Sequence, residues 1–600
     1  MNEQYTLITT ELEETWPVDG KVLFLGEWCR LHTRRQQWQK LEGYVQPYHW
    51  DDREKLKQDF YYLQELNQRL LLEILPIMNT LHQVNYDVGY WRLILGYWLN
   101  NYTAVLFDRW SSIEVATNAG LLLKTNVLTT PDEFLASNDT ADFIHQATEN
   151  PYWNHALFNL LIHRKIGIVA KTLQSGQTGN ELVIKKSYSK KNPLFKTLTS
   201  KLLVLIAKHL KKRDTITMMS TYLPRKSLWW LDMKFGQLPS YWYAPDLPIF
   251  LFDATRRHWQ LEVLSKSTDF EVLVRQLLPD LLPKSFLEGF DQITRTVEDL
   301  PWPRSPSVIW TSVNHFSNDL FKYWAAKKCA HGTRLVIGEH GGLGVGAFNG
   351  AHSYEVSVAD RYLSTGWCDE KYQNIIPVGN FRQLNMQKRP LVIGQALLVC
   401  GIMPRYSFDV RAMMLSSQVL SYFEDQFRFV QGLTPTIQQE LLVRLDNVDY
   451  KWAQKERWKE RYPNIAIDNR NHSLWKVAEN CRLLIATYNA TTYIESLSLN
   501  FPTVIFWNPK HWEVTEAAVP FFEGLKEVGI FHETPESAAQ HINKVWHDVA
   551  KWWQREEVQM ARAHFCEAYA SNPPDIMDRI EVLLKEEAVI GEALIASKLN

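Results

Sequence analysis

Cysteines are few in this sequence, and none of them belongs to a paired motif. Six cysteines are scattered singly over 600 residues, and no two are separated by only two residues. Zinc knuckles and disulfide frameworks both need closely spaced cysteines, so neither is indicated. This usage fits a reducing compartment.

Long hydrophobic runs and an excess of one charge are also missing. The longest apolar runs, near residues 70–78 and 202–207, fall far short of the ~20 residues of a membrane span. Residues 1–16 are acidic and polar, unlike a signal peptide. The net charge is −2, so no general basic field attracts nucleic acid. We therefore expect a cytoplasmic protein that does not bind nucleic acid.

The composition itself is that of a globular protein. Apolar residues make up 46% and charged residues 22% of the chain, close to the average of soluble domains. At roughly 100–200 residues per domain, this length predicts more than one domain. The 24 tryptophans are expected in cores and at domain interfaces, where burial of a large ring is most favourable.

Hydrophobic patterning divides the chain into a helix-rich first part and an α/β remainder. The run 21–25 predicts a buried strand that delivers Glu27 to a loop, and helical spacing predicts helices over 51–82 and 90–107. From about residue 305, short apolar runs alternate with helical patterns, which predicts parallel sheets. Strands are expected at 307–312, 333–340, 361–366, 396–401, 440–445, 482–487 and 502–507.

One segment is strongly basic. Residues 185–213 contain nine lysines, one arginine and no acidic residue. Such a segment can lie against anionic lipid. A solvated basic helix face is the alternative interpretation.

A glycine-rich turn carries the first candidate catalytic residue. Five glycines, among them Gly341 and Gly342, fall within positions 338–346, and glycine at this density lets backbone N–H groups approach a ligand. His340 follows an expected strand at its carboxyl end, where open α/β sheets bind ligands, and can take a proton from a hydroxyl group. A flexible turn with a structural histidine is the alternative. The spacing matches neither a dinucleotide-binding fingerprint nor a P-loop, so we expect no resident cofactor.

A second candidate is a polar turn between the strand 482–487 and a helix that carries Glu495. Hydroxyls and free N–H groups at a helix N-terminus favour phosphate, and a carboxylate one turn further can accept both hydroxyls of a ribose. An ordinary capped helix is the alternative. The turn residues are Tyr488, Asn489, Thr491 and Thr492.

A third candidate is Arg444, which ends the expected strand 440–445. Its guanidinium would point to the same sheet edge and is suited to a bidentate grip on phosphate. Pairing with Asp446 or Asp449 is the alternative.

The order of these segments resembles the CDP-glycerol glycerophosphotransferase-like enzymes of GT-B fold. IGEHGG at 337–342 is similar to their His-Gly motif, and TYNATT at 487–492 stands where they have a TDYSS-like turn. LVRLDN at 442–447 stands in place of their Lys-x-His-Pro, which leaves Arg444 for the phosphate.

The N-terminal segments narrow this resemblance. VLFLGEWCRL at 22–31, PYHWDDREKLKQDFYYL at 47–63 and YWRLILGYWLNNY at 90–102 are similar to a transferase family of O-antigen and surface-carbohydrate clusters, first described from leptospiral genomes. The resemblance covers roughly residues 20–545. It implies a nucleotide-activated donor.

Together these observations predict an α/β, GT-B-like fold with two facing Rossmann-like domains, a helix-rich N-terminal part and C-terminal helices. We expect an acceptor-side domain over 1–380 and a nucleotide-donor-binding domain over 390–545. The polar stretch 380–395 links them, and helices over 546–600 pack back on both.

The expected function is transfer of a sugar from a nucleotide-activated donor to a hydroxyl of a carbohydrate or lipid-linked glycan, in O-antigen or surface-polysaccharide biosynthesis. The acceptor is expected near Glu27, His32 and His340, with His340 and Glu27 as catalytic residues. No DxD pair lies between the expected strands, so no metal site is indicated. The alternatives are a CDP-linked polyol-phosphate transferase, a CMP-linked acidic-sugar transferase and a non-catalytic scaffold. Contact through 185–213 would place the enzyme on the inner face of the cytoplasmic membrane.

Overall fold

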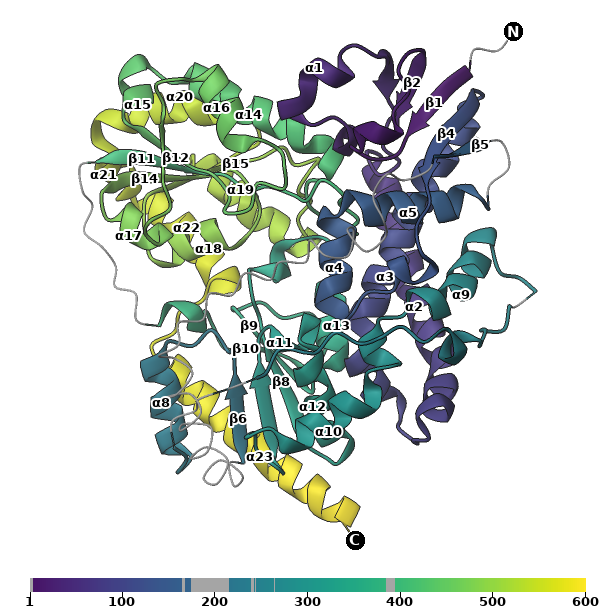
Figure 1. Ribbon diagram of the computed structural model, residues 1–600. Coiled ribbons are helices and arrows are strands. Elements are labelled where there is room, and N and C mark those ends of the chain that lie inside the picture. The colour runs from purple at the N-terminus through teal and green to yellow at the C-terminus, as the bar shows by residue number, and fades with distance from the viewer. Residues whose placement is uncertain are drawn as a thin grey trace, which may run out of the picture.

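Three β-sheets, each with all strands parallel, organise the chain (Figure 1). The computed structural model describes residues 4–164, 168–173, 215–238, 242, 244–263, 265–384 and 394–599. The basic segment 185–213, proposed above to contact lipid, lies outside these residues. In the part of the chain that is described, no helix is both long and apolar enough to cross a bilayer.

The first sheet, in the purple and blue part of Figure 1, has the strand order β3-β2-β1-β4-β5. The predicted strand at 21–25 is its β2. The sequence analysis did not anticipate the other four strands, so residues 1–380 contain two sheets and not one. The strands are β1 Gln4–Ile8, β2 Lys21–Phe24, β3 Glu42–Val45, β4 Leu122–Leu128 and β5 Ile168–Leu173.

Two long helices connect this sheet to the rest of the molecule. α2 (Arg53–His82) and α3 (Val88–Asn118) match the predicted helices, and the side chains of Asp52 and Asp87 cap their first turns. α3 is apolar on nearly all sides because it packs against α2, α5, α12 and α13. It therefore forms the shared core of the N-terminal half.

The middle sheet has the order β10-β9-β8-β7-β6 and holds the candidate turn at the carboxyl end of β8. α12 (Asp319–Ala330) and α13 (Gly350–Val358) are among the helices that connect its strands. The strands are β6 Ile216–Met219, β7 Val308–Thr311, β8 Arg334–Gly338, β9 Arg361–Ser364 and β10 Ile375–Pro377.

The third sheet has the order β13-β12-β11-β14-β15-β16. With its helices it forms the green and yellow part of Figure 1, which is called the third domain below. α14 (Val419–Gly432) and α18 (Thr491–Ser498) are two of its helices. Its strands are β11 Gln395–Val399, β12 Leu441–Arg444, β13 Ala466–Ile467, β14 Cys481–Ala486, β15 Thr503–Phe506 and β16 Phe531–His532.

The C-terminal helices join the third domain to the middle sheet. α22 (Glu556–Tyr569) packs on α18 and α19 (Val519–Glu527). The chain then crosses back, where Ser571 N–H donates to the Thr365 carbonyl at 2.8 Å. α23 (Ile576–Leu599) lies on β7 and β8. The end of the chain therefore ties the two domains to each other.

Most of the remaining helices are short, and they pack on the sheets or on other helices. They are α1 Arg35–Trp38, α4 Thr140–Glu149, α5 Pro151–Ile162, α8 Arg225–Lys234, α9 Asp269–Leu281, α10 Phe290–Asp299, α11 Asn314–Ser317, α15 Pro435–Gln439, α16 Gln454–Arg461, α17 Leu474–Ala478, α20 Pro535–Val545 and α21 Val549–Trp553.

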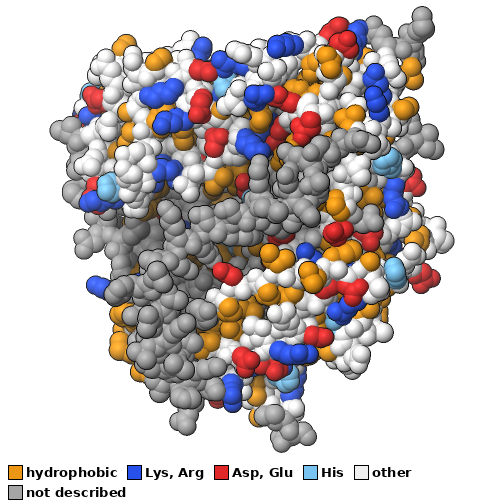
Figure 2. Space-filling model, in the orientation of Figure 1, with side chains coloured by type: hydrophobic (Ala, Val, Ile, Leu, Met, Phe, Trp, Pro, Cys, Tyr) orange, Lys and Arg blue, Asp and Glu red, His pale blue; other side chains and the backbone are white. Residues whose placement is uncertain are grey.

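The predicted fold class, α/β with Rossmann-like parallel sheets, is confirmed. The seven strands expected after residue 305 are all present, as β7, β8, β9, β11, β12, β14 and β15. Acidic and basic side chains are interspersed over the described part of the face in Figure 2. This mixture agrees with the small net charge of the chain.

Candidate functional site

The turn after β8 reaches across to the third domain. Gly341 and Gly342 have φ of +89° and +70°, in the left-handed region that favours glycine. A Cβ on Gly342 would lie 2.2 Å from Cδ1 of Ile494, and one on Gly341 would lie 3.7 Å from Oγ1 of Thr491. The structure therefore brings the His-Gly-Gly turn and the start of α18 together, although 150 residues separate them in the sequence.

His340 is held by a buried carboxylate from the next helix. Its Nδ1 lies 3.2 Å from Oε1 of Glu355 on α13, and Nε2 of His315 lies 3.1 Å from the same oxygen. The Glu355 side chain is fully buried, whereas 28% of the His340 side chain is exposed. His340 is thus anchored from the interior and keeps an accessible edge.

The charge state of Glu355 follows from these contacts. Burial acts to raise its pKa, but the hydrogen bonds from His315 and His340 outweigh burial and lower the pKa to about 2. Burial also lowers the pKa of His315, which favours its neutral form. An ionised carboxylate at Nδ1 orients the His340 ring, leaves Nε2 to take a proton and stabilises the resulting imidazolium.

The facing end of α18 has no side-chain cap. Its N-cap residue is Ala490, which has no side-chain acceptor for the first backbone N–H groups of the helix. The surrounding turn is ordered by its own side chains: the hydroxyls of Tyr488 and Thr492 lie 2.8 Å apart, and Tyr493 Oη–H donates to Oδ1 of Asn489 at 2.9 Å. Uncapped N–H groups and the helix dipole together attract an anion.

Glu495, one turn into α18, lies where the third domain meets the segment that follows the middle sheet. Trp475 Nε1–H donates to its Oε2 at 2.9 Å, and Nε of Arg382 lies 3.6 Å from its Oε1. Burial raises the pKa of Glu495. Gln383, which like Arg382 precedes the link to the third domain, donates to the Glu495 carbonyl at 3.0 Å. The carboxylate is therefore fixed at the interface, and its contact with a ribose stays a prediction.

Arg444 forms an ion pair with a partner that the sequence analysis did not consider. Its side chain is 8% exposed, forms an ion pair with Asp468 and donates to the His472 carbonyl at 3.1 Å. β13 pairs with β12, so the residue that follows β13 lies beside the end of β12. Arg444 is thus occupied by Asp468, not by Asp446 or Asp449, and it is not a free cation for phosphate.

Glu27 and His32 belong to another contact. Arg30 pairs with the Glu27 carboxylate, and Arg405 donates to the Glu27 carbonyl at 2.6 Å. Nε2 of His32 lies 3.1 Å from Oε2 of Glu460. Among the described residues, no hydrogen bond or ion pair joins these two to His340. They connect the first sheet to the third domain, and their place on the acceptor side stays a prediction.

Sequence reasoning missed the residues that support His340 and Glu495. Glu355 closes the glycine-rich segment three residues after His352, a spacing that places both on one face of a helix. This spacing is the one signal that could have identified Glu355. His315 and Arg382 come from other elements, and only the folded chain reveals them.

Comparison with protein families identifies the class of protein. The model of a family described as "LIC12162 family transferase" matches residues 5–584, nearly the whole chain. The chain belongs to the LIC12162 family of transferases. This match confirms the predicted resemblance to a transferase family, and the protein is therefore a transferase. A comparison with curated proteins gave no match.

Solved structures with related folds share little sequence with this LIC12162 family member. The MnaA–UDP co-structure from S. aureus has 8% identity and a TM-score of 0.33, covering 78% of this chain and 97% of that chain. A UDP-N-acetylglucosamine 2-epimerase from Rickettsia bellii has 10% identity and a TM-score of 0.32, covering 55% and 82%. WaaG, a glycosyltransferase involved in lipopolysaccharide biosynthesis, has 12% identity and a TM-score of 0.26, covering 62% and 99%. The site is argued from the chain's own geometry, because all three TM-scores are low.

Proposed function

We propose that this LIC12162 family transferase is a nucleotide-sugar-dependent glycosyltransferase of O-antigen or surface-polysaccharide biosynthesis. It would move an activated sugar onto a hydroxyl group of a carbohydrate or lipid-linked glycan. The observation that carries the proposal is the approach of the His340 turn to the uncapped start of α18. A general base and an anion site then face each other across the domain contact.

The donor would lie against the third domain. Its diphosphate would accept hydrogen bonds from the N–H groups of Thr491 and Thr492, with Tyr488 and Asn489 ordering the turn and Glu495 placed for the ribose. A helix N-terminus can stabilise the negative charge that develops on a departing diphosphate. The proposal therefore assigns this charge to α18 and needs neither a metal ion nor a resident cofactor.

The acceptor hydroxyl would approach Nε2 of His340. Its oxygen attacks the anomeric carbon, a new carbon–oxygen bond forms, and the bond to the diphosphate breaks with its electron pair leaving on the phosphate. The hydroxyl proton passes to Nε2 of His340, and the ionised Glu355 at Nδ1 stabilises the resulting imidazolium. The accessible edge of His340 favours this role over that of a non-catalytic scaffold.

A melting-temperature screen with nucleotides tests the donor site. We expect one of CMP, CDP, UDP, GDP or dTDP to raise the melting temperature, because ligand binding stabilises the folded state. Gly342→Ala should bind that nucleotide more weakly, because its Cβ would displace Ile494 and with it the start of α18, a shift of the kind that costs about 1–3 kcal/mol in a packed core.

Gly346→Ala is the matched control. A Cβ on Gly346 meets no atom within 4 Å, so this variant should keep the parental shift. If no nucleotide stabilises the parent protein, the proposed function is wrong. If Gly342→Ala and Gly346→Ala respond alike, the nucleotide does not bind at α18.

A further inference from the structure

A cavity lies beside the candidate site, between the N-terminal helices and the third domain. Its volume is about 460 Å³, which is large enough for a small ligand. Residues of α2, α3 and α4 line one side, and the loop 402–411 of the third domain lines the other. The N-terminal end of α13, at Asn349 and Gly350, forms part of the wall.

Four carboxamide side chains from α2 and α3 face this cavity. Asn101 donates to the Tyr97 carbonyl at 2.6 Å, and Oδ1 of Asn67 accepts from Thr103 at 2.7 Å. The side chains of Gln64 and Asn100 have no hydrogen bond to any described residue, so both can donate to and accept from a ligand. Paired donors and acceptors of this kind match hydroxyl groups.

The remaining lining includes aromatic and aliphatic side chains, two carboxylates, one arginine and one histidine. Arg411 pairs with Asp409 at 2.8 Å, and His145 lies 3.3 Å from Glu149. Because Arg411 has an acidic partner and Glu149 adds a second carboxylate to the lining, the cavity does not favour a phosphate or another anion. The rings that face the cavity are Phe60, Tyr97, Phe408 and Tyr450.

The ring of Phe316 lies between the cavity and His340. The ring centroids of Tyr97 and Phe316 are 4.7 Å apart, and those of Phe316 and His340 are 5.0 Å apart. α13 begins at the cavity with Gly350 and, five residues later, carries the Glu355 that holds His340. The Phe316 ring would therefore separate a ligand in the cavity from the proposed base, a spacing that suits a sugar unit of the acceptor beyond the one that reacts.

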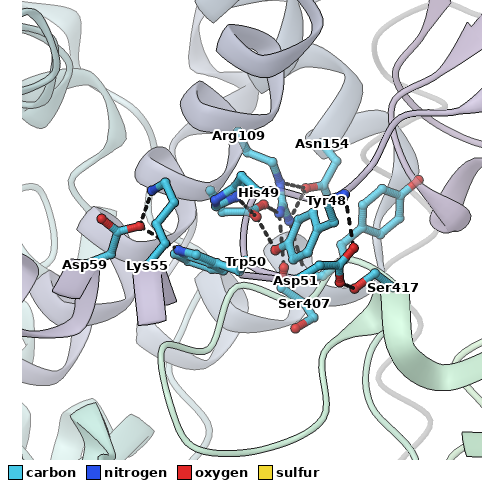
Figure 3. Close-up of polar contacts among 12 residues, drawn as sticks. Tyr48, His49, Trp50, Asp51, Lys55, Asp59, Arg109, Asn154, Ser407 and Ser417 are labelled. Atoms are coloured by element: carbon cyan, nitrogen blue, oxygen red, sulfur yellow. Dashed lines mark hydrogen bonds and ion pairs between the residues drawn. The ribbon is translucent and has the colours of Figure 1, made fainter. Parts of the chain in front are cut away.

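A buried polar cluster around Arg109 holds the loop 402–411, part of which lines the cavity (Figure 3). Arg109 of α3 pairs with Asp108 and donates to the carbonyls of Tyr406 and Ser407, both at 3.3 Å. Arg405 is 2% exposed and donates to carbonyls of the first sheet's loop. The loop 402–411 is thus held before any ligand arrives, and a wall ordered in advance lowers the entropic cost of binding.

We infer that this cavity binds an uncharged sugar unit of the acceptor glycan. The inference rests on the proposed function, because it gives the cavity the substrate that His340 would deprotonate. Carboxamides match the hydroxyls of a sugar, the rings match its apolar faces, and the two carboxylates of the lining disfavour the diphosphate. The sugar of the donor has the same chemistry, so the experiment must separate the two sources.

The test uses one blocking variant and its matched control. Ala141 lines the cavity from α4 but is exposed, so Ala141→Trp can fill the cavity without disturbing the core. Ala563, exposed on α22, is not among the residues that line the cavity, and Ala563→Trp adds the same ring there. The double variant Gln64→Ala/Asn100→Ala removes the two unpaired amides. Near-parental melting temperatures establish that each variant is folded.

The probes are methyl glycosides of glucose, galactose, mannose, rhamnose and N-acetylglucosamine, and binding is measured by saturation-transfer NMR on the full chain. We expect at least one glycoside to bind the parent and Ala563→Trp, and the signal to be lost in Ala141→Trp. Gln64→Ala/Asn100→Ala should bind about tenfold more weakly, as expected for two lost hydrogen bonds of modest strength. The nucleotide-induced melting shift should be the same in all four proteins.

Three results would overturn the inference. One is that no glycoside binds the parent, and another is that Ala141→Trp binds as well as Ala563→Trp. The third is that Ala141→Trp loses the nucleotide shift, which would assign the cavity to the donor. If instead the parent shows no nucleotide shift at all, the proposed function fails, whatever the glycosides do.

Discussion

Replacing His340 by alanine is expected to lower kcat by about 10²–10⁴-fold, the usual contribution of a general base. The imidazole is the proton acceptor of the proposed reaction, and Glu355 holds it by Nδ1 at 3.2 Å. Nucleotide binding should change far less, because the donor is held mainly by α18. The measurement is steady-state turnover with the nucleotide sugar identified by the melting screen, beside the melting shift of the variant.

Two further variants decide what His340 does. His340→Gln keeps a hydrogen-bonding group but cannot take the proton, so it should be as slow as His340→Ala. His331→Ala, which removes an exposed histidine before the amino end of β8, opposite the end that carries the turn, should leave kcat unchanged. Near-parental turnover of His340→Gln would show that the residue only positions substrate. Loss of nucleotide binding together with turnover in His340→Ala would place it in the donor site.

The pH dependence of kcat also tests whether His340 acts as the base. Because the pKa of Glu355 is lowered to about 2, this carboxylate stays ionised throughout the range of an ordinary assay. A fall of kcat toward acid pH then reports protonation of the base, since an imidazolium cannot accept the acceptor's proton. Glu355→Gln should lower kcat without abolishing nucleotide binding, because Glu355 acts through His340.

Arg109→Met is expected to destabilise the protein by about 3–5 kcal/mol, the usual cost of removing one partner of a buried ion pair. Arg109 and Asp108 are both fully buried, and Arg109 also donates to Oδ1 of Asn154 at 3.0 and 3.2 Å (Figure 3). Burial acts to raise the pKa of Asp108, but the charge of Arg109 is the main effect that lowers it below its ordinary value. The variant leaves that carboxylate buried without its cation and detaches the loop 402–411.

Arg69→Met is the control for this prediction. Arg69 is 44% exposed, and its buried partner Glu271 also lies 3.7 Å from Arg275, so Arg69→Met leaves that carboxylate a second cation and should cost less than Arg109→Met. The measurement is the urea midpoint of the first unfolding transition, followed by tryptophan fluorescence. The prediction is wrong if Arg109→Met loses no more stability than Arg69→Met. If Arg109→Met does not accumulate as folded protein, Arg109→Lys, which keeps the charge, should still fold with a lower midpoint than the parent.

The strands that sequence reasoning found are those buried on both faces. β7, β8, β11 and β14 are short apolar runs within parallel sheets, and such runs end in small polar turns that mark them clearly. The first sheet was missed because its edge strands lack this signal. Glu42–Val45 is mostly exposed, and Ile168–Leu173 has no buried residue. Edge strands of this kind read as polar loops.

The site could be predicted only where local sequence determines it. His340 and Thr491 were found because each follows a strand end within one strand–turn–helix unit. The partner of Arg444 was not found, because Asp468 reaches it through the pairing of β12 with β13. The partners of Glu27 and His32 were missed for a similar reason, because Arg405 and Glu460 come from the third domain. Contacts between distant segments depend on tertiary packing, which single-sequence periodicity does not encode.

The central claim is that a nucleotide diphosphate binds where the His340 turn meets α18, and a crystal structure of the complex with the nucleotide that gives the largest melting shift tests it most directly. The account predicts the diphosphate within hydrogen-bonding distance of the N–H groups of Thr491 and Thr492, with His340 facing the position of the sugar. A diphosphate bound away from the start of α18, in the carboxamide-lined cavity or elsewhere, would contradict it.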